Sequence, residues 1–512
     1  MSSAVRERPR DQEQPPEGRR RRWPADWLPF VMGGVGLVTF LLHGWDAVFT
    51  RDLALYSYAG QTVADGVPPY VGVLNRAGPL AHLLPSIGVL VARTYGGDEV
   101  FALRFFYMLV SVVAVGVAYV LGRDVFRSRL AGLVTSATFL SFHAFILYAT
   151  GGPREKTPMV LFIMLALWAA SRRKWMTAGV FVSLATLTLQ IAFFLAFPAV
   201  LLAVGTVQRS ERVRAGLRVV VGGIVPLAVT AVYFAVVGAL SDFVLGFLIL
   251  NAHYNRASSL LTHLGPDWAS LRVGYGVSLW FLLLGLVLVL AFSVAALRVD
   301  RRRASPWIVF VAALGPAVVI DLFWNFRDFD SWADAIPLLP VAALGFGAVV
   351  KAVQERLSQR AAWTVGGAWL VLTLVTALVY SISYHDARFV AQRRSVTAVL
   401  AQVPANATVL SIEAPQALVL TDRRNPSRYQ MFTGGMENYV DDQWPGGLDG
   451  YARWILRTRP DLVTIGPNQY DVWGSALGSG YTWVGCAPEW RWYASRTLSP
   501  QVLAALRRAS PC

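Results

Sequence analysis

Apolar runs of helical length recur along this chain, and they restrict its fold more than any other feature. A helix that crosses a bilayer needs roughly 20 mostly apolar residues, because no water is present there to satisfy the backbone. The sequence contains eleven candidate spans, at 27–48, 101–122, 130–150, 157–171, 176–190, 191–207, 217–239, 275–297, 306–324, 334–350 and 361–384. We therefore predict an α-helical polytopic membrane protein with about eleven transmembrane helices.

The basic residues between these runs predict the orientation of the chain. Cytoplasmic loops of membrane proteins carry an excess of Lys and Arg. With the N-terminus inside, the inner segments hold 24 of these residues and the outer loops hold nine. The same count favours two short helices over one long broken helix in 176–207, since dropping a helix would invert every later loop. We expect a multi-pass protein of the cell membrane, with its N-terminus in the cytoplasm and its C-terminal segment outside.

Composition divides the chain into three parts. Residues 1–26 are rich in Pro, Glu and Arg, which predicts a disordered basic N-terminus in the cytoplasm. Residues 27–384 form the membrane module, with a polar outer loop at 49–100, and residues 385–512 follow it outside the membrane. The net charge of +15 would suggest nucleic-acid binding in a soluble protein. Here the arginines lie in short clusters between apolar runs, so we expect no nucleic-acid partner.

Beyond residue 385, helix and strand patterns alternate, which predicts a small α/β domain. We expect helices at 393–404 and 447–460, and strands at 407–413, 417–422, 461–466 and 482–498. The domain fits a passive cap on the membrane part, which we favour, or a role in substrate recognition. Its two cysteines, Cys486 and Cys512, fit a disulfide and a reduced pair equally well.

The segment that follows the first apolar run is unusually long and polar for a link between membrane helices. "RDLALYSYAGQTVADG" predicts a helix from Arg51 that ends at Gly66 and has Asp52 and Tyr56 on one face. "VPPY" then excludes helix, and a second amphipathic helix follows within 76–97. We expect both helices to lie on the outer leaflet.

This loop resembles the multispanning glycosyltransferases that use polyprenyl-phosphate sugars, the GT-C superfamily. The similar branch is that of bacterial protein O-mannosyltransferases and lipid A aminoarabinose transferases. The residues that match its pattern are Arg51, Asp52, Tyr56, Tyr58, Gly66, Pro69, Tyr70, Asn75, Arg76 and Pro79. The chain departs from the pattern at three places, with Leu53 instead of a second acid, Val71-Gly72 instead of an acid after "PY", and Ala77-Gly78 instead of Pro-Pro.

The resemblance implies an inverting transfer of a sugar from a polyprenyl-phosphate donor to an acceptor hydroxyl. The acceptor would be an envelope glycan, a lipid or a protein at the outer face of the membrane. By motif position Asp52 is the general base, with Asp46 as its rival. Cations must stabilise the charge that grows on the leaving phosphate. The residues expected to bind substrate are Arg51, Tyr56, Tyr70, Arg76, Glu155, Lys156, Tyr254, Arg256 and Arg327.

Two other classes of function remain open. A polytopic transporter of a lipid-linked or small envelope precursor should carry ionisable residues within its spans, but here Asp321 is the main exception in otherwise apolar helices. A non-catalytic scaffold for envelope assembly would use the polar loop only as an interfacial anchor. No His, Cys and Asp cluster has metal-ligand spacing, so we predict no cofactor, and a divalent metal is unsupported.

Overall fold

The computed structural model describes residues 26–254, 264–298, 305–327, 329–384 and 386–512 of the 512-residue chain. The predicted disordered N-terminus therefore lies outside the described residues except for Asp26, and so does Arg256.

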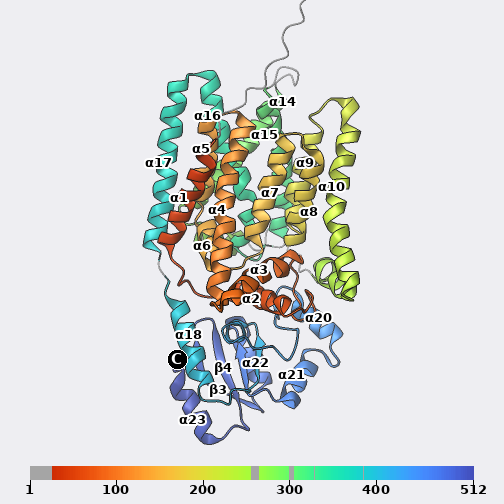
Figure 1. Ribbon diagram of the computed structural model, residues 1–512, viewed down its shortest axis with the longest axis vertical. Helices are drawn as coiled ribbons and strands as arrows, with labels where there is room; N and C mark the ends of the chain where they lie inside the picture. The colour runs from red at the N-terminus through yellow and green to blue at the C-terminus, as the bar shows by residue number, and fades with distance from the viewer. Residues whose placement is uncertain (1–25, 255–263, 299–304, 328, 385) are drawn as a thin grey trace, which may run out of the picture.

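Long apolar helices pack side by side in one elongated bundle (Figure 1). They are α1 (Leu28–His43), α4 (Glu99–Phe126), α5 (Arg129–Leu140), α6 (His143–Gly151), α7 (Lys156–Ser171), α8 (Trp175–Thr188), α9 (Ala192–Val204), α10 (Arg209–Val236), α14 (Ser278–Leu297), α15 (Pro306–Arg327), α16 (Leu339–Arg356) and α17 (Gln359–Ser383). Small residues let some of these backbones approach closely. A Cβ on Gly222 of α10 would lie 2.0 Å from the carbonyl oxygen of Met176, and one on Gly285 of α14 would lie 2.4 Å from that of Ala342.

The expected count of eleven membrane spans is not confirmed. Among the described residues, six helices are long and apolar enough to cross a membrane, or seven if the α5–α6 pair, bent by 67°, is one span. The other four expected spans coincide with apolar helices of only 16, 16, 14 and 13 residues, which are α1, α7, α8 and α9. The sequence shows where these helices lie, although α1 and α9 end earlier than the apolar runs that predict them.

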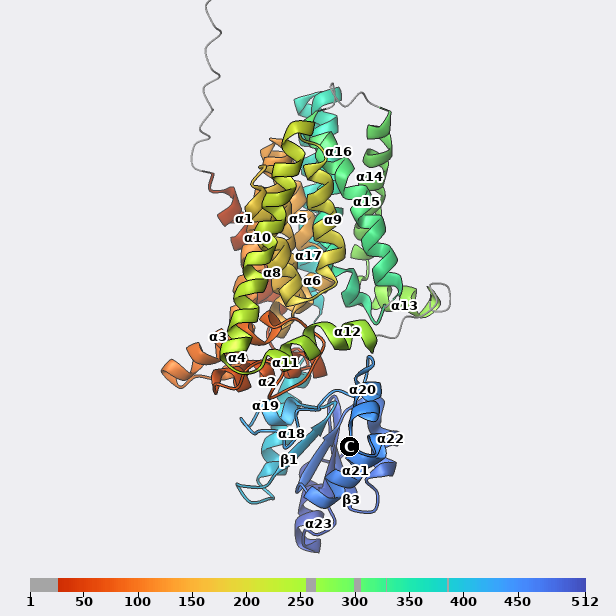
Figure 2. The same cartoon turned by 90° about the vertical axis from the view of Figure 1, so that its right-hand side faces the viewer.

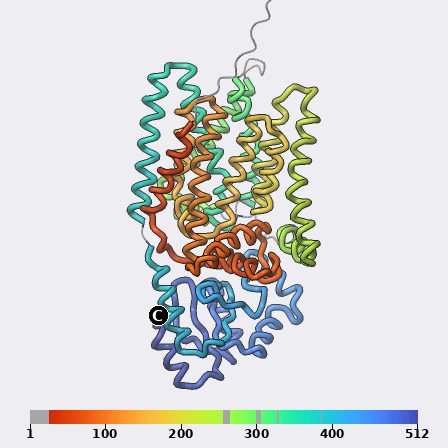
Figure 3. Tube along the Cα trace, in the orientation of Figure 1, coloured from red at the N-terminus to blue at the C-terminus, as the bar shows by residue number. Residues whose placement is uncertain are grey.

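Shorter helices lie across one end of the bundle, between it and the C-terminal region (Figures 1 and 3). The first two are α2 (Arg51–Ala64) and α3 (Leu80–Tyr95), as the sequence predicts. Figure 2 shows α3 extending sideways from this end, and its outer face exposes apolar side chains such as Leu90 and Val91. The same layer contains α11 (Leu240–Val244), the π-helical turn η1 (Leu245–Ile249), α12 (Leu250–His253), α13 (Leu264–Tyr275) and the 3₁₀ helix η2 (Trp332–Leu338).

The C-terminal region is a four-stranded sheet with helices around it (Figure 1). Its strands are β1 (Val409–Ile412), β2 (Leu462–Ile465), β3 (Tyr481–Ala487) and β4 (Trp490–Ser495), in the order β1-β2-β4-β3. β1 and β2 are parallel and the other pairs are antiparallel. The helices are α18 (Arg388–Leu400), α19 (Gln416–Val419), α20 (Met436–Gln443), α21 (Gly447–Thr458), η3 (Pro467–Gln469), α22 (Tyr470–Ala476) and α23 (Pro500–Ala509).

One strand predicted for this region is wrong. Residues 417–422 were expected to be extended, but they contain most of the short helix α19 and the turn after it. Pro415 precedes this helix in a helical conformation, and the next residue, Gln416, is buried with its amide donating to the carbonyl of Phe49 (3.2 Å). A short apolar run does not distinguish a buried helix from a strand, so packing against the segment before α2 decides the outcome.

A shared apolar core attaches the C-terminal region to the bundle end. Phe49 and Leu53, at the start of α2, belong to one buried cluster with Trp490 and Trp492 of β4. Gln392 of α18 adds two hydrogen bonds to the backbone of Phe49, at 2.8 and 3.0 Å. Burial of this apolar surface fixes the sheet directly over α2. Farther from the bundle, a disulfide joins Cys486 to Cys512, with 5.1 Å between their Cα atoms.

Candidate active site

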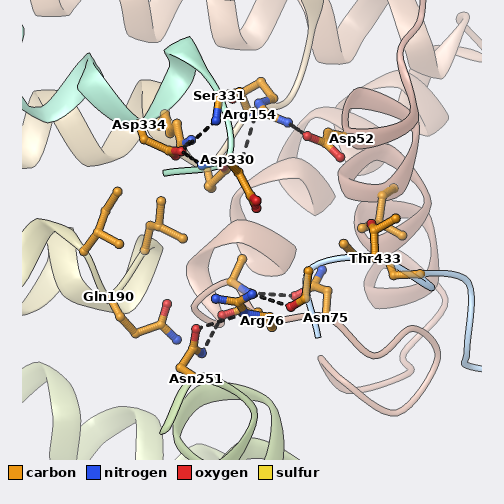
Figure 4. Close-up of a pocket in the computed structure, with 18 of the residues that line it drawn as sticks. Asp52, Asn75, Arg76, Arg154, Gln190, Asn251, Asp330, Ser331, Asp334 and Thr433 are labelled. Carbon is orange, nitrogen blue, oxygen red and sulfur yellow. Dashed lines mark hydrogen bonds and ion pairs between the residues drawn. The ribbon is translucent and has the colours of Figure 1, made fainter. Parts of the chain in front are cut away.

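A cavity of about 470 Å³ lies where the bundle end, the α2–α3 loop and the C-terminal region meet (Figure 4). Segments distant in sequence converge on it. Its lining residues are Arg51, Asp52, Leu55, Tyr56, Asn75, Arg76, Ala77, Arg154, Glu155, Lys156, Leu189, Gln190, Ile191, Phe194, Asn251, Trp324, Asn325, Asp330, Ser331, Asp334, Met431, Thr433, Gly434 and Asn468.

Asp52 stands between two guanidinium groups in this cavity. Its Oδ1 accepts from Nε of Arg51 at 2.8 Å, and its Oδ2 accepts from Nη1 of Arg154. Burial by itself would raise the pKa of Asp52, but the charges of Arg51 and Arg154 outweigh it and hold the pKa well below its usual range. Asp52 also occupies the first turn of α2, where the helix dipole favours an acid. The carboxylate is therefore ionised at neutral pH.

The segment before α7 supplies three consecutive buried charges, Arg154, Glu155 and Lys156. The preceding Gly152, with φ of +123°, and Pro153 end α6 and turn the chain into the cavity. Nζ of Lys156 lies 2.6 Å from Oδ1 of Asp334, which also caps η2. A buried charge requires such pairing, so these contacts fix the wall opposite α2.

Arg76 reaches the cavity from the α2–α3 loop. Nε of Arg76 donates to Oδ1 of Asn251 at 3.4 Å, and the amide of Asn251 donates in return to the carbonyl of Arg76 at 2.9 Å (Figure 4). Nη1 of Arg76 donates to the carbonyl of Gly434. Gly78 lets the loop lie directly against α8, because a Cβ there would lie 2.0 Å from the carbonyl oxygen of Leu187. Arg76 is thus held by two segments distant in sequence, at Asn251 and at Gly434.

One side of the cavity is apolar. Leu189, Ile191 and Phe194 contribute from the start of α9, and Trp324 contributes from the end of α15. The rings of Phe194 and Trp324 stack with centroids 4.4 Å apart, and Trp324 is 41% exposed. The cavity therefore combines charged groups with an apolar side formed by two bundle helices.

The structure brings together six of the ten predicted site residues: Arg51, Asp52, Tyr56, Arg76, Glu155 and Lys156. Tyr56 faces Glu155. Burial raises the pKa of the Tyr56 hydroxyl well above its usual value, and the negative charge of Glu155 raises it further. The phenol is therefore protonated at neutral pH and available as a hydrogen-bond donor.

Three other predicted residues lie away from the cavity lining, and Arg256 lies outside the described residues. Tyr70 is fully buried, donates to the carbonyl of Ala77 at 2.8 Å and supports the loop from behind. The ring of Tyr254 packs against Tyr439, with centroids 5.2 Å apart. Arg327 is exposed and lies over the ring of Trp324. The rival acid Asp46 is exposed and lines neither this cavity nor the second one.

Sequence reasoning missed several polar residues of the site. Asn251, Asp334 and Thr433 line the cavity, and Glu413 contacts Arg51 at 2.6 Å. Asp334 is the last residue of the polar run 325–334, in which only Arg327 is predicted to bind substrate, so that run was a usable signal. Glu413 and Thr433 belong to the C-terminal region and had no local signal. Among the described residues, no group of three or more His, Cys, Asp or Glu is placed to hold a metal ion.

A second cavity, of about 590 Å³, adjoins the first at Asp52. Both cavities are lined by Arg51, Asp52, Arg154, Ser331 and Asn468. The remaining walls of the second come from the segment before α2, from α6, from the start of η2 and from the C-terminal region, with acids Asp386, Glu413 and Glu489 among them. Asp52 and its two arginines therefore form the partition between two adjoining cavities.

Comparison with known proteins agrees with this architecture. Residues 77–235 match the family model described as dolichyl-phosphate-mannose-protein mannosyltransferase. No curated protein matches the chain. The fold is similar to that of ArnT from Cupriavidus metallidurans bound to undecaprenyl phosphate, with a TM-score of 0.60 and 12% identity over 92% of this chain and 98% of that chain.

Two further structures are similar. ArnT from Cupriavidus metallidurans in the apo state has a TM-score of 0.58 and 12% identity, covering 95% of this chain and 99% of that chain. The apo oligosaccharyltransferase of Archaeoglobus fulgidus has a TM-score of 0.52 and 13% identity, covering 95% of this chain and 78% of that chain. The helical bundle of this chain is apolar enough to span a membrane, and the chain has the fold of the GT-C glycosyltransferases.

Proposed function

We propose that this protein is a membrane glycosyltransferase that moves a sugar from a polyprenyl-phosphate donor to an acceptor hydroxyl, with inversion at the anomeric carbon. The observation that carries the proposal is the position of Asp52, ionised between two arginines in the partition between two cavities. A transfer enzyme needs such a place, because donor and acceptor must reach one reacting carbon from opposite faces.

The first cavity suits the donor. Its apolar side, at Phe194 and Trp324, offers a lipid chain a path from the bundle surface. Arg76 and Lys156 provide cations at the polar side, where a phosphate charge would be stabilised. The similar ArnT structure was solved with undecaprenyl phosphate bound, which supports a lipid phosphate as the donor's leaving group.

We assign the acceptor to the second cavity, which Asp52 also lines. An acceptor hydroxyl that enters there would reach Asp52, which also lines the donor cavity. Its oxygen would bond to the anomeric carbon as the bond from that carbon to the phosphate oxygen breaks. The hydroxyl proton would pass to Asp52, and the polyprenyl phosphate would leave with its negative charge next to the arginines. Because the pKa of Asp52 is low, the proton transfers only when the new carbon–oxygen bond is well advanced.

The test uses the full-length protein in lipid nanodiscs with a panel of polyprenyl-phosphate hexoses and pentoses. We expect at least one donor to bind and to be hydrolysed slowly, with release of polyprenyl phosphate measured by mass spectrometry, and Asp52→Asn to abolish release. A protein that binds no member of the panel has another donor class. Ion-coupled flux of a precursor in sealed vesicles, with no transfer, would identify a transporter instead.

A further inference from the structure

A buried glutamate of the C-terminal region reaches into the site. Glu413 follows β1, and its side chain is only 4% exposed. Its Oε1 accepts from the amide of Phe432 and from Oγ1 of Thr433 at 3.1 Å, while its Oε2 accepts from Nη1 of Arg51 at 2.6 Å. Nη1 of Arg51 also donates to Oγ1 of Thr433 at 2.7 Å. Glu413 and Thr433 thus hold one end of the Arg51 guanidinium, and Asp52 holds the other.

The backbone around Glu413 is built for this position. Glu413 has φ of +58°, in the left-handed region that residues other than glycine rarely adopt. A Cβ on the neighbouring Gly466 would lie 2.5 Å from the carbonyl oxygen of Glu413, so a glycine is needed at the end of β2 for the two segments to meet. Unfavourable backbone conformations of this kind persist where surrounding structure enforces them, and they cluster at functional sites.

The residues next to Thr433 hold the second arginine of the loop. The carbonyl of Gly434 accepts from Nη1 of Arg76, and a Cβ on Gly434, whose φ is +62°, would lie 3.3 Å from that nitrogen. The C-terminal region therefore contacts both Arg51 and Arg76. A passive cap, which the sequence favoured, would not need a buried charge paired with the arginine beside the candidate base.

We infer that Glu413 is a positioning residue that fixes Arg51 against Asp52 and so couples the C-terminal sheet region to the transfer reaction. The inference rests on the proposed function. Without the carboxylate of Glu413, Arg51 loses its second anionic partner and turns towards the cavity, and the orientation of Asp52 is no longer fixed. Donor affinity depends mainly on Arg76, Lys156 and the apolar side, so it should change less than turnover.

The experiment compares Glu413→Gln with Asp461→Asn in the full-length protein. Asp461 is a carboxylate of the same region that accepts from the amide of Thr408 at 2.7 Å and lines neither cavity. For Glu413→Gln we expect turnover at saturating donor to fall about ten- to a hundredfold, the scale found for groups that orient a reacting residue, with little change in KM. For Asp461→Asn we expect the turnover per folded molecule to equal that of the wild type. Equal losses for the two variants per folded molecule would overturn the inference.

A double variant tests whether Glu413 acts through Arg51. If it does, adding Glu413→Gln to Arg51→Gln causes no further loss of turnover, whereas losses that multiply would contradict the inference. Labelling of Arg51 by phenylglyoxal, quantified by mass spectrometry, needs no donor. We expect severalfold faster labelling in Glu413→Gln and unchanged labelling in Asp461→Asn. If the wild type turns over no donor, the proposed function fails, but unchanged labelling of Arg51 in Glu413→Gln would refute the positioning role by itself.

Discussion

Replacing Asp52 with asparagine is the most direct test of the site. The substitution keeps the shape of the side chain but removes the proton acceptor, which contributes roughly 10²- to 10⁴-fold in general-base catalysis. Arg51 keeps Glu413 at 2.6 Å, and Arg154 keeps Glu155 at 3.5 Å. Removing one partner of a fully buried ion pair costs about 3–5 kcal/mol. Since Asp52 is 30% exposed and both arginines retain a partner, we expect a loss of about 1–2 kcal/mol in the free energy of unfolding.

The assay is the initial rate of polyprenyl-phosphate release in nanodiscs, measured from pH 5 to pH 9 on wild type and variant. Because the pKa of Asp52 is lowered in the folded protein, the carboxylate is ionised over this whole range and gives wild-type turnover no acid limb there. The lowered pKa of Asp52 also makes the free energy of unfolding depend on pH. The contribution of Asp52 is fully present above its unfolded pKa of about 4 and is lost as the pH falls through the lower folded value.

Asp46→Asn is the matched control, because Asp46 is an exposed acid six positions earlier that lines neither cavity. We expect its turnover to equal that of the wild type. A rate for Asp52→Asn within about threefold of the wild type would refute the assignment of the base, since an essential base should contribute far more. An equal loss in both variants would show that the assay reports a general disturbance of this loop.

Three further outcomes are expected. Lys156→Met breaks the buried 2.6 Å ion pair with Asp334, and denaturation curves should show a loss of about 3 kcal/mol in the free energy of unfolding. Adding Asp334→Asn should restore part of this loss, because it removes the unpaired buried charge. Gly78→Ala places a Cβ 2.0 Å from the carbonyl oxygen of Leu187 in α8, so it should reduce both the melting temperature and the affinity for the donor. Gly34→Ala is the control and should change neither, because the added Cβ would meet open space. Reducing the disulfide between Cys486 and Cys512, which are 26 positions apart, should destabilise the C-terminal region by about 3.5 kcal/mol in the chain-entropy model. The stability of a variant with both cysteines replaced by serine should not respond to the reductant.

Local patterns in the sequence were sufficient for most of the helices and strands. Apolar runs located every bundle helix, because apolarity over a helical length is a property of neighbouring residues. The polar loop was also readable, since Pro68-Pro69 and Gly66 stop a helix wherever they occur. Local patterns failed at 417–422, where packing against Phe49 favours a helix. The count of eleven spans is not confirmed by the lengths of the described helices.

Local sequence patterns are enough to identify the membrane class, the α2–α3 loop and the candidate acid Asp52. The surroundings of that acid depend on how distant segments pack together. Lys156 meets Asp334 across 178 positions, and Arg51 meets Glu413 across 362. The first pair depends on how α7 packs against η2, and the second on how the sheet region packs over α2, and no spacing along the chain encodes either. For the same reason the fold separated Tyr70, which supports the loop from behind, from Arg76, which faces the cavity.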